Sequence, residues 1–279
     1  MLPDPLGRRQ EPEQQTAPAK ERPTRDLGRL LIIPDAHAHS RHDNRRFDWL
    51  AGLIAEERPE HIVCVGDWWD LPSVCKHSSR AALEGHRLAA DLEVGWDAMR
   101  RLSRGWADYE PRRHMCLGNH EDRLDGLWAE SPALGGALPD TKYLTHGLEC
   151  FGWTVSRFKE TVDVCGYATS HYLPSGVMGR PVGGVNQGRS LQTKGFVSAI
   201  VGHSHVRSEY QSTDYLGDRL QSINAGYYGH EDSVEGWNRN THQLWWSGVA
   251  MVRLESVARG RGFGDVSWIS QKHLRDRYG

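Results

Sequence analysis

The sequence lacks the features that define several large classes of protein. None of its 279 residues lies in an apolar run near the roughly 20 residues that a membrane-spanning helix needs. The first residues contain no apolar segment of a secretory signal. The five cysteines form no C-x-x-C pair, which excludes an obvious disulfide framework or zinc knuckle. We therefore expect a protein of the reducing cytoplasm that has no membrane partner.

A strong charge of either sign is also missing. The formal net charge is -2, and the chain is 38% hydrophobic and 25% charged, as in average globular proteins. This balance gives no reason to expect strong non-specific binding to nucleic acid or to an anionic membrane. What stands out is the 15 histidines, because imidazole is the commonest metal-ligand side chain.

The first 27 residues differ in composition from the rest of the chain. They are rich in Pro, Glu, Gln and Arg and contain no aromatic residue, which is typical of a segment that cannot offset the entropy of ordering. We predict a disordered tail over residues 1–27 and a folded domain over residues 28–279. No internal repeat is evident.

Buried strands and helices alternate in the first half of the folded region, and strands dominate after about residue 143. Alternation with continuous apolar strands predicts a largely parallel sheet with helices outside. The two halves are compatible with two domains or with two sheets of one sandwich. The predicted strands are 30–33, 62–65, 115–117, 153–158, 162–171, 196–202, 209–215, 220–224 and 244–254. A first helix is predicted from the spacing of Phe47, Leu50, Leu53 and Ile54 and ends before Pro59. Two more helices are predicted over 80–102 and around 186–194.

Polar residues follow the strands at five points. The sequences are Asp35-Ala-His37, Gly66-Asp67-Trp-Trp-Asp70, Gly118-Asn119-His120-Glu121, His171 and Gly202-His203-Ser-His205. In α/β sheets, ligands bind beyond the carboxyl ends of the strands, so we expect these side chains to converge. Each piece alone is weak, since an H-x-H pair is expected about once by chance in such a chain. The ordered set of five is the informative signal.

This ordered set resembles the calcineurin-like metallophosphoesterase family, whose pattern is D-x-H, G-D-x-x-D, G-N-H-[ED], H and G-H-x-H. The resemblance covers residues 30–226. The segments GDWWDLPS, GNHEDR and SINAGYYG further resemble members encoded by bacteriophages, in which case the location would be the host cytoplasm. The resemblance implies an α/β sandwich of two mixed β-sheets flanked by helices.

The resemblance also implies two divalent metal ions that share one carboxylate. One ion would take Asp35, His37, Asp67 and His205, and the other Asp67, Asn119, His171 and His203. A ligand set of carboxylate, imidazole and amide without thiolate suits Mn²⁺ first, and Fe or Zn²⁺ as alternatives. Two such ions stabilise both the attacking and the leaving oxygen of an in-line displacement. His120 matches the family's residue that contacts phosphate and assists the leaving oxygen.

The sequence allows two interpretations for several other residues. Asp70 either orients a ligand imidazole or caps the next helix, and His39 is expected to support the site or to be exposed rather than to bind metal. Arg123 and Arg207 either grip a phosphate or are solvated. Trp68 and Trp69 offer a stacking ring for a base, although core packing of one of them is expected. The glycine-rich segment 174–188 is a candidate for a mobile loop over the substrate.

We therefore expect a metal-dependent phosphoric ester hydrolase. Phosphodiesters such as cyclic nucleotides or nucleic-acid ends are favoured over monoesters on three grounds. The R-G of the protein phosphatases is missing after Asp70, Trp68 and Trp69 lie beside the site in sequence, and no cluster of lysines is present. The alternatives are a DNA or RNA nuclease with the same metal centre, a phosphomonoesterase, and an idle metal-binding scaffold. The sequence indicates no obligate protein partner and leaves the oligomeric state open.

Overall fold

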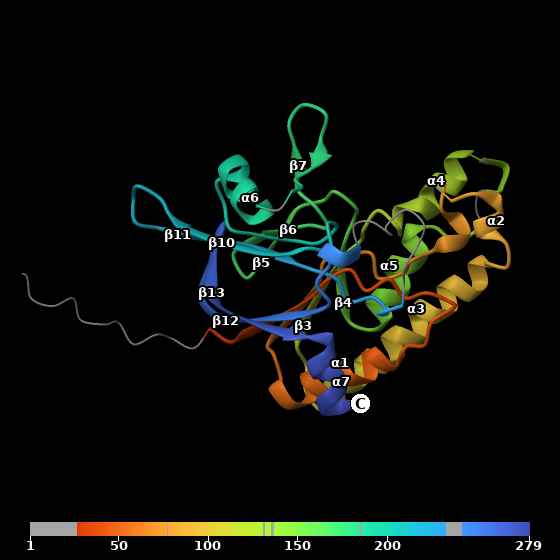
Figure 1. Ribbon diagram of the computed structural model, residues 1–279, viewed down its shortest axis with the longest axis horizontal. Helices are drawn as coiled ribbons and strands as arrows, with labels where there is room; N and C mark the ends of the chain where they lie inside the picture. The colour runs from red at the N-terminus through yellow and green to blue at the C-terminus, as the bar shows by residue number, and fades with distance from the viewer. Residues whose placement is uncertain (1–26, 77, 131, 135–136, 185, 233–241) are drawn as a thin grey trace, which may run out of the picture.

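The computed structural model describes residues 27–279 apart from positions 77, 131, 135–136, 185 and 233–241 (Figure 1). The predicted disordered tail therefore lies outside the described residues, except for Leu27. Leu27 is half-buried and packs against the core between the two sheets. Within the described part of the chain, no helix is both long and apolar enough to cross a membrane.

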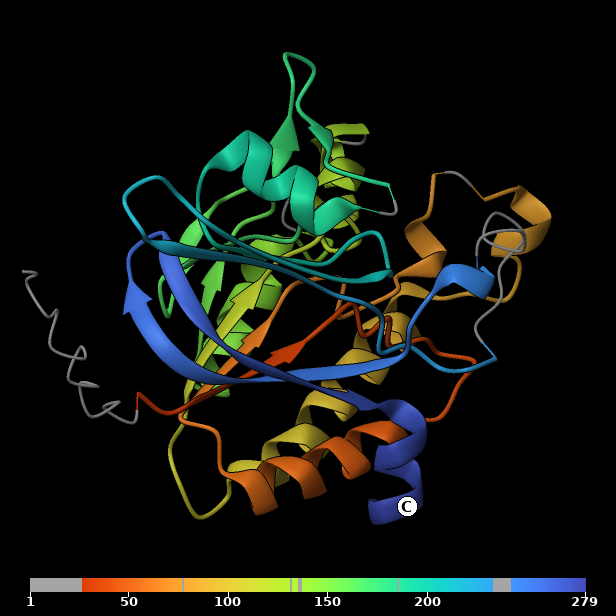
Figure 2. The same cartoon turned by 60° about the vertical axis from the view of Figure 1, so that its left-hand side comes forward.

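Two mixed sheets lie face to face and are flanked by helices, as expected for an α/β sandwich (Figure 2). The first sheet has the strand order β13-β12-β1-β2-β3-β4, and the second has the order β10-β11-β9-β6-β5. The first sheet contains β1 (Arg29–Ile33), β2 (His61–Cys64), β3 (Arg112–Cys116), β4 (Trp153–Ser156), β12 (Gly248–Ala258) and β13 (Arg261–Ser270). The second contains β5 (Val162–Val164), β6 (Tyr167–Thr169), β9 (Ala199–Val201), β10 (Arg207–Thr213) and β11 (Arg219–Ala225).

The helices cover the outer faces of both sheets. Figure 2 shows α1, α3 and α7 below the first sheet and α6 above the second. The longer helices are α1 (Arg45–Glu57), α3 (Leu88–Leu102), α4 (Asp122–Glu130), α5 (Thr141–Cys150), α6 (Gln187–Gly195) and α7 (Gln271–Tyr278). Short elements are α2 (Arg80–Leu83), the 3₁₀ turns η1 (Pro72–Val74), η2 (Ser103–Trp106), η3 (Pro132–Leu134) and η4 (His242–Leu244), and the hairpin β7 (Pro174–Ser175)–β8 (Arg180–Pro181).

Strand β1 shows why the apolar runs are continuous. Leu30 and Ile32 belong to the core between the two sheets, whereas Leu31 and Ile33 belong to the core beneath the helices. Both faces of the strand are thus buried, and all four side chains are inaccessible to solvent. A strand buried on both faces needs apolar residues at every position rather than at alternate ones.

Three expectations about the elements were wrong. The helix predicted over 80–102 is two helices, since Gly85 between α2 and α3 has a left-handed φ of 83°. The strand predicted over 162–171 is the β5–β6 hairpin, whose two turn residues, Cys165 and Gly166, both have positive φ. The strand predicted to begin at residue 244 begins at Gly248, after the 3₁₀ turn η4.

Candidate metal centre

The five polar segments meet at the carboxyl ends of strands from both sheets. Three segments follow the parallel strands β1, β2 and β3 of the first sheet, and two follow β6 and β9 of the second. Interactions across the two sheets join them: the backbone N–H of His203 donates to Asp35 at 2.8 Å, and His171 Nε2 lies 3.3 Å from Asp67 Oδ2. The structure brings together all of the predicted metal ligands, which are Asp35, His37, Asp67, Asn119, His171, His203 and His205.

Asp67 lies at the centre of this group. Its Oδ2 atom is 3.3 Å from His171 Nε2, 3.7 Å from His120 Nε2 and 3.8 Å from His37 Nε2. The carboxylate is nearly inaccessible to solvent. Although burial alone would raise its pKa, His120 and His171 beside it hold the pKa of Asp67 well below its usual range. One ionised carboxylate therefore faces donor groups on two sides.

The first donor cluster consists of Asp35, His37 and His205. The ligand atoms of the three buried side chains lie within 4.8 Å of one another, and His205 Nε2 is 3.1 Å from Asp35 Oδ2. Asp35 Oδ1 and His37 Nε2 are buried and have no hydrogen-bond partner among the described residues. Buried polar atoms are rarely left unpaired in native proteins. Two orphaned acceptors on the residues of one donor cluster fit a bound cation.

The second donor cluster consists of Asp67, His171 and His203, again with their ligand atoms within 4.8 Å. Asn119 Oδ1 completes it, at 2.9 Å from both His171 Nε2 and His203 Nδ1. His171 Nδ1 lies 2.9 Å from the backbone carbonyl of Val65, which it can contact only as a donor. The other ring nitrogen of His171 is then left to face the cluster, as in histidines that bind metal.

The electrostatics of the cluster also fit cation binding. Burial and the neighbouring His171 lower the pKa of His203 to about 4, so its imidazole is neutral and its lone pair is available at neutral pH. For His171, burial would lower the pKa, but Asp67 and Asp35 outweigh it and raise the pKa to about 9. A positive charge is thus favoured between these carboxylates. Metal ligands must be deprotonated, so a metal ion would take the place of that proton.

Glycines allow the strand ends to approach the carboxylates closely. A Cβ atom on Gly118 would lie 2.0 Å from Asp67 Oδ1, and one on Gly202 would lie 2.1 Å from Asp35 Oδ1. Neither distance is physically possible without a shift. The glycines that begin the G-N-H and G-H-x-H segments are therefore required by packing against the two carboxylates.

The backbone is left-handed at four of the candidate ligands. The φ angles are 43° at His37, 47° at Asp67, 70° at His203 and 59° at His205. Positive φ is uncommon outside glycine and clusters at functional sites, where the surrounding structure holds it. The polar segments are therefore bent sharply to aim their side chains inward.

Asp70 orients two imidazoles rather than capping a helix. Its Oδ1 atom is 3.0 Å from His37 Nδ1 and 3.1 Å from His120 Nδ1. The following turn, η1, is preceded by Leu71 and has no side-chain cap. The structure therefore supports the interpretation that Asp70 orients a ligand imidazole.

His120 and Arg123 line a cavity of ≈ 350 Å³ together with candidate ligands from both clusters. Arg123 Nη2 lies 2.8 Å from His120 Nε2, and its Nη1 donates to the backbone carbonyl of Asp70 at 2.9 Å. The remaining lining residues are Asp67, Cys75, Asn119, His203 and His205. An imidazole and a guanidinium thus face the space next to the donor clusters.

Glu121 has a role that the sequence analysis missed. Its carboxylate is buried and accepts hydrogen bonds from the backbone N–H groups of Asp67, Trp69 and Gly118, at 3.1, 2.9 and 2.7 Å. It ties the loop after β2 to the loop after β3. The acidic last position of the G-N-H-[ED] segment was the available signal.

Two of the predicted contacts to substrate are not found. Arg207 does not line the cavity; its guanidinium lies over the rings of Trp246 and Trp268, 5.2 and 5.4 Å from their centroids. Trp68 and Trp69 are both fully buried, and their indole N–H groups donate to backbone carbonyls of α3. Neither tryptophan can stack on a base.

The structure also shows where His39 and the glycine-rich segment 174–188 lie relative to the donor clusters. His39 is buried and belongs to neither donor cluster, nor to the further group of His37, Asp70 and His120 whose ligand atoms also lie within 4.8 Å of one another. Its Nε2 lies 3.7 Å from Asp70 Oδ2. The glycine-rich segment 174–188 contains the β7–β8 hairpin, whose tip exposes Val177 and Met178. None of the described residues of this segment lines the ≈ 350 Å³ cavity.

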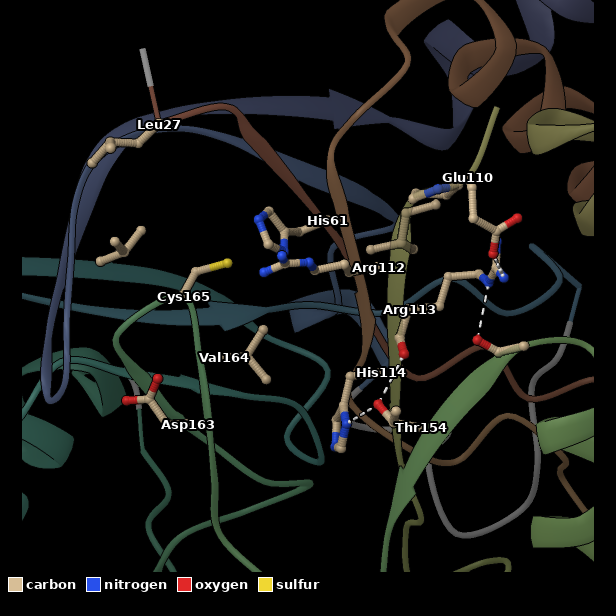
Figure 3. Close-up of a pocket in the computed structure, with 14 residues that line it drawn as sticks. Leu27, His61, Glu110, Arg112, Arg113, His114, Thr154, Asp163, Val164 and Cys165 are labelled. Atoms are coloured by element: carbon tan, nitrogen blue, oxygen red, sulfur yellow. Dashed lines mark hydrogen bonds and ion pairs between the residues drawn. The ribbon is translucent and has the colours of Figure 1, made fainter. Parts of the chain in front are cut away.

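A larger cavity of ≈ 690 Å³ lies at the opposite, amino-terminal ends of β2 and β3. Figure 3 shows His61 and Arg112 projecting toward Cys165 and Val164 across it. None of the candidate ligands lines this cavity, and its residues contribute to no donor group among the described residues. Chemistry rather than size therefore favours the ≈ 350 Å³ cavity as the candidate functional site.

No model of a known protein family matches the chain, and a search of the curated proteins finds no match. The evidence on function therefore comes from the structure, in which buried groups of aspartate and histidine side chains could hold metal ions.

Proposed function

We propose that the protein is a dinuclear-metal-dependent phosphoesterase of the calcineurin-like metallophosphoesterase family that prefers phosphodiesters. The observation that carries this proposal is the pair of donor clusters on either side of Asp67, which open onto one cavity with His120. Two adjacent cation sites with a shared carboxylate are typical of enzymes that hydrolyse phosphate esters. A cytoplasmic location and a bacteriophage origin remain proposals from the sequence.

The residues of the chain divide into two ligand sets around Asp67. Asp35, His37 and His205 would hold one ion with Asp67, and Asn119, His171 and His203 would hold the other. Mn²⁺ suits this oxygen and nitrogen donor set, with Fe or Zn²⁺ as alternatives. When bound, the ions supply Lewis acidity and an acidified water.

The protein's own groups then position the substrate and handle protons. Arg123 faces the cavity and can donate two hydrogen bonds to a phosphoryl group once it releases His120. His120 Nδ1 is held by Asp70, so its Nε2 atom is the one that reaches the cavity and can give a proton to the leaving oxygen. Burial of Asp70 and His120 strengthens the interactions that these two residues make.

A preference for diesters follows from the small number of cations in the cavity. Among the described residues that line the cavity, Arg123 alone is a lysine or an arginine. A monoester dianion carries one more negative charge than a diester and needs additional cationic donors. Cyclic nucleotides and short nucleic-acid fragments are therefore the substrates to examine first.

The test is an assay of purified protein that has been depleted of metal and then reloaded with Mn²⁺. The substrates are bis(p-nitrophenyl) phosphate, p-nitrophenyl phosphate, cyclic nucleotides and short oligonucleotides. We expect two ions per chain and faster hydrolysis of the diesters. Two bound ions without hydrolysis of any ester would instead identify an idle metal-binding protein, and retention of no metal would refute the proposal.

A further inference from the structure

The segment 202–205 supplies one candidate ligand to each donor cluster. His205 belongs to the first cluster and His203 to the second, and Ser204 lies between them. Both histidines have a left-handed backbone, with φ angles of 59° and 70°. Residues other than glycine keep such a conformation only where the surrounding structure holds it. The contacts that hold Ser204 therefore bear on the position of a ligand in each cluster.

The hydroxyl of Ser204 is held by two buried amide side chains. It donates to Gln187 Oε1 and accepts from Asn224 Nδ2, each at 2.5 Å. Asn224 Nδ2 also donates to Gln187 Oε1, so the three side chains form a closed ring of hydrogen bonds. Gln187 and Asn224 are 1% and 0% exposed. A buried polar network whose members are paired makes the groups that it joins rigid.

Gln187 also ties this network to the segment that follows the candidate ligand His171. Its Nε2 atom donates to the backbone carbonyl of Val182 at 2.7 Å, and the backbone N–H of Val182 donates to the carbonyl of Leu173 at 3.3 Å. Because a carbonyl can only accept, the amide nitrogen of Gln187 must face Val182, and its amide oxygen must face Ser204. Gln187 thus joins two ligand-bearing segments of the second sheet.

We propose that Gln187 is a positioning residue of the metal centre, acting through Ser204 on His203 and His205. Gln187 is the first residue of α6 and lies in the glycine-rich segment 174–188. That segment would then serve the site by supporting two ligands, since none of its described residues lines the ≈ 350 Å³ cavity. The inference rests on the proposed function for the identity of the ligands. Without Gln187, the segment 202–205 can relax, and both imidazoles shift.

Gln192 provides a matched control on the same helix. It is 4% exposed, its Nε2 donates to the backbone carbonyl of Tyr210 at 2.8 Å, and its Oε1 accepts from the Ser212 hydroxyl at 2.6 Å. Gln187 likewise bonds one backbone carbonyl and one serine hydroxyl. Replacing either glutamine by alanine therefore removes equivalent groups from buried surroundings. The partners of Gln192, however, belong to β10 and not to the segment 202–205.

Equilibrium dialysis against Mn²⁺ compares the full-length variants with the wild type, after thermal unfolding has shown that each one folds. In Gln187→Ala we expect the affinity for both ions to fall about 10–100-fold, as is typical when a group that orients a metal ligand is lost. Gln192→Ala should match the wild type. Ser204→Ala should show the same loss as Gln187→Ala, and the double variant no more than either, because the two residues act as one unit. Unchanged affinity in Gln187→Ala, or equal losses in the two glutamine variants, would overturn the inference.

Hydrogen exchange in the metal-free proteins provides a readout that does not depend on metal binding. The backbone N–H of His203 donates to Asp35 at 2.8 Å, and that of Ser204 donates to the carbonyl of Gly202 at 2.9 Å, so both report on the opening of this segment. We expect faster exchange at these two positions in Gln187→Ala than in Gln192→Ala. That result supports the inference even if the wild type binds no metal, in which case only the phosphoesterase proposal fails. Unchanged exchange at both positions overturns it.

A second pair of variants covers the case in which Gln187→Ala does not fold. Gln187→Met and Gln192→Met keep the length of the side chain but remove its hydrogen bonds. The same expectations and the same contrary outcomes apply to this pair.

Discussion

The imidazoles of His37 and His120 are held by the same carboxylate oxygen, Oδ1 of Asp70, at 3.0 and 3.1 Å from their Nδ1 atoms. Their ring centroids are 4.5 Å apart. His120 Nδ1 also lies 2.7 Å from the backbone carbonyl of Asp70, and with both Nδ1 atoms held by Asp70 both Nε2 atoms face Asp67. A candidate metal ligand and a candidate proton donor are thus oriented by one residue.

Substitution of Asp67 should separate the metal sites. In Asp67→Asn we expect loss of activity and a fall in bound metal toward one ion per chain, because the shared carboxylate faces both clusters. Elemental analysis of the purified variant gives the metal content. Two retained ions with full turnover would contradict the dinuclear assignment.

His120→Ala should harm substrates with poor leaving groups most. An alkoxide must be protonated as it departs, whereas nitrophenolate needs little help, and general acid catalysis contributes about 10²–10⁴-fold. The losses in kcat for an alkyl and a nitrophenyl diester should therefore differ by at least about tenfold. Metal content should match that of the wild type. Equal losses would leave His120 a role in positioning phosphate only, and loss of one ion would make it a ligand.

Gly202→Ala should weaken metal binding without replacing a ligand. The new Cβ would lie 2.1 Å from Asp35 Oδ1, so the carboxylate or the end of β9 must move. Displacing a group that supports a metal ligand typically lowers affinity by about 10–100-fold. Gly183→Ala is the control, because a Cβ there meets nothing within 4 Å. Equilibrium dialysis of both variants against Mn²⁺ checks the expectation, which equal affinities would refute.

His42 should make the stability of the fold depend on pH. Burial and the nearby His230 and His39 lower its pKa to about 4 from the ordinary 6.5. Between these values the unfolded chain binds the proton more readily than the folded chain, so the free energy of unfolding falls as the pH falls through this window. Urea unfolding at about pH 7 and about pH 5 should show a smaller loss for His42→Gln than for the wild type. Identical losses would show that His42 is not responsible.

The sequence predicted the strands that lead into the site better than it predicted the edges of the sheets. Strands β1 and β2 are buried on both faces and read as continuous apolar runs, whereas β3 is apolar only at its carboxyl end. The polar residues after all three strands converge as expected. Strand β13 was not predicted, and the position of β12 beside β1 depends on pairing between residues more than 200 apart, such as Leu30 with Val252. Local patterns carry no information about such pairing.

Side-chain environment was harder to predict than strand position. Trp68 and Trp69 flank Asp67 in sequence, yet both turn into the core against α3. Arg207 follows His205 by two residues but points to Trp246 and Trp268 instead of the cavity. Conversely, Trp245 is far from every motif and reaches His205 only through the fold. Which side of the chain faces the site is decided by tertiary packing.

The left-handed backbone at His37, Asp67, His203 and His205 bears on how this chain can change by mutation. A side chain held in that conformation costs roughly 1–2 kcal/mol, whereas glycine adopts it without steric strain. A lineage that no longer used metal could therefore gain stability by drifting to glycine at any of these four positions. The chain has imidazole or carboxylate at all four, so it keeps the less stable backbone together with the donor atoms.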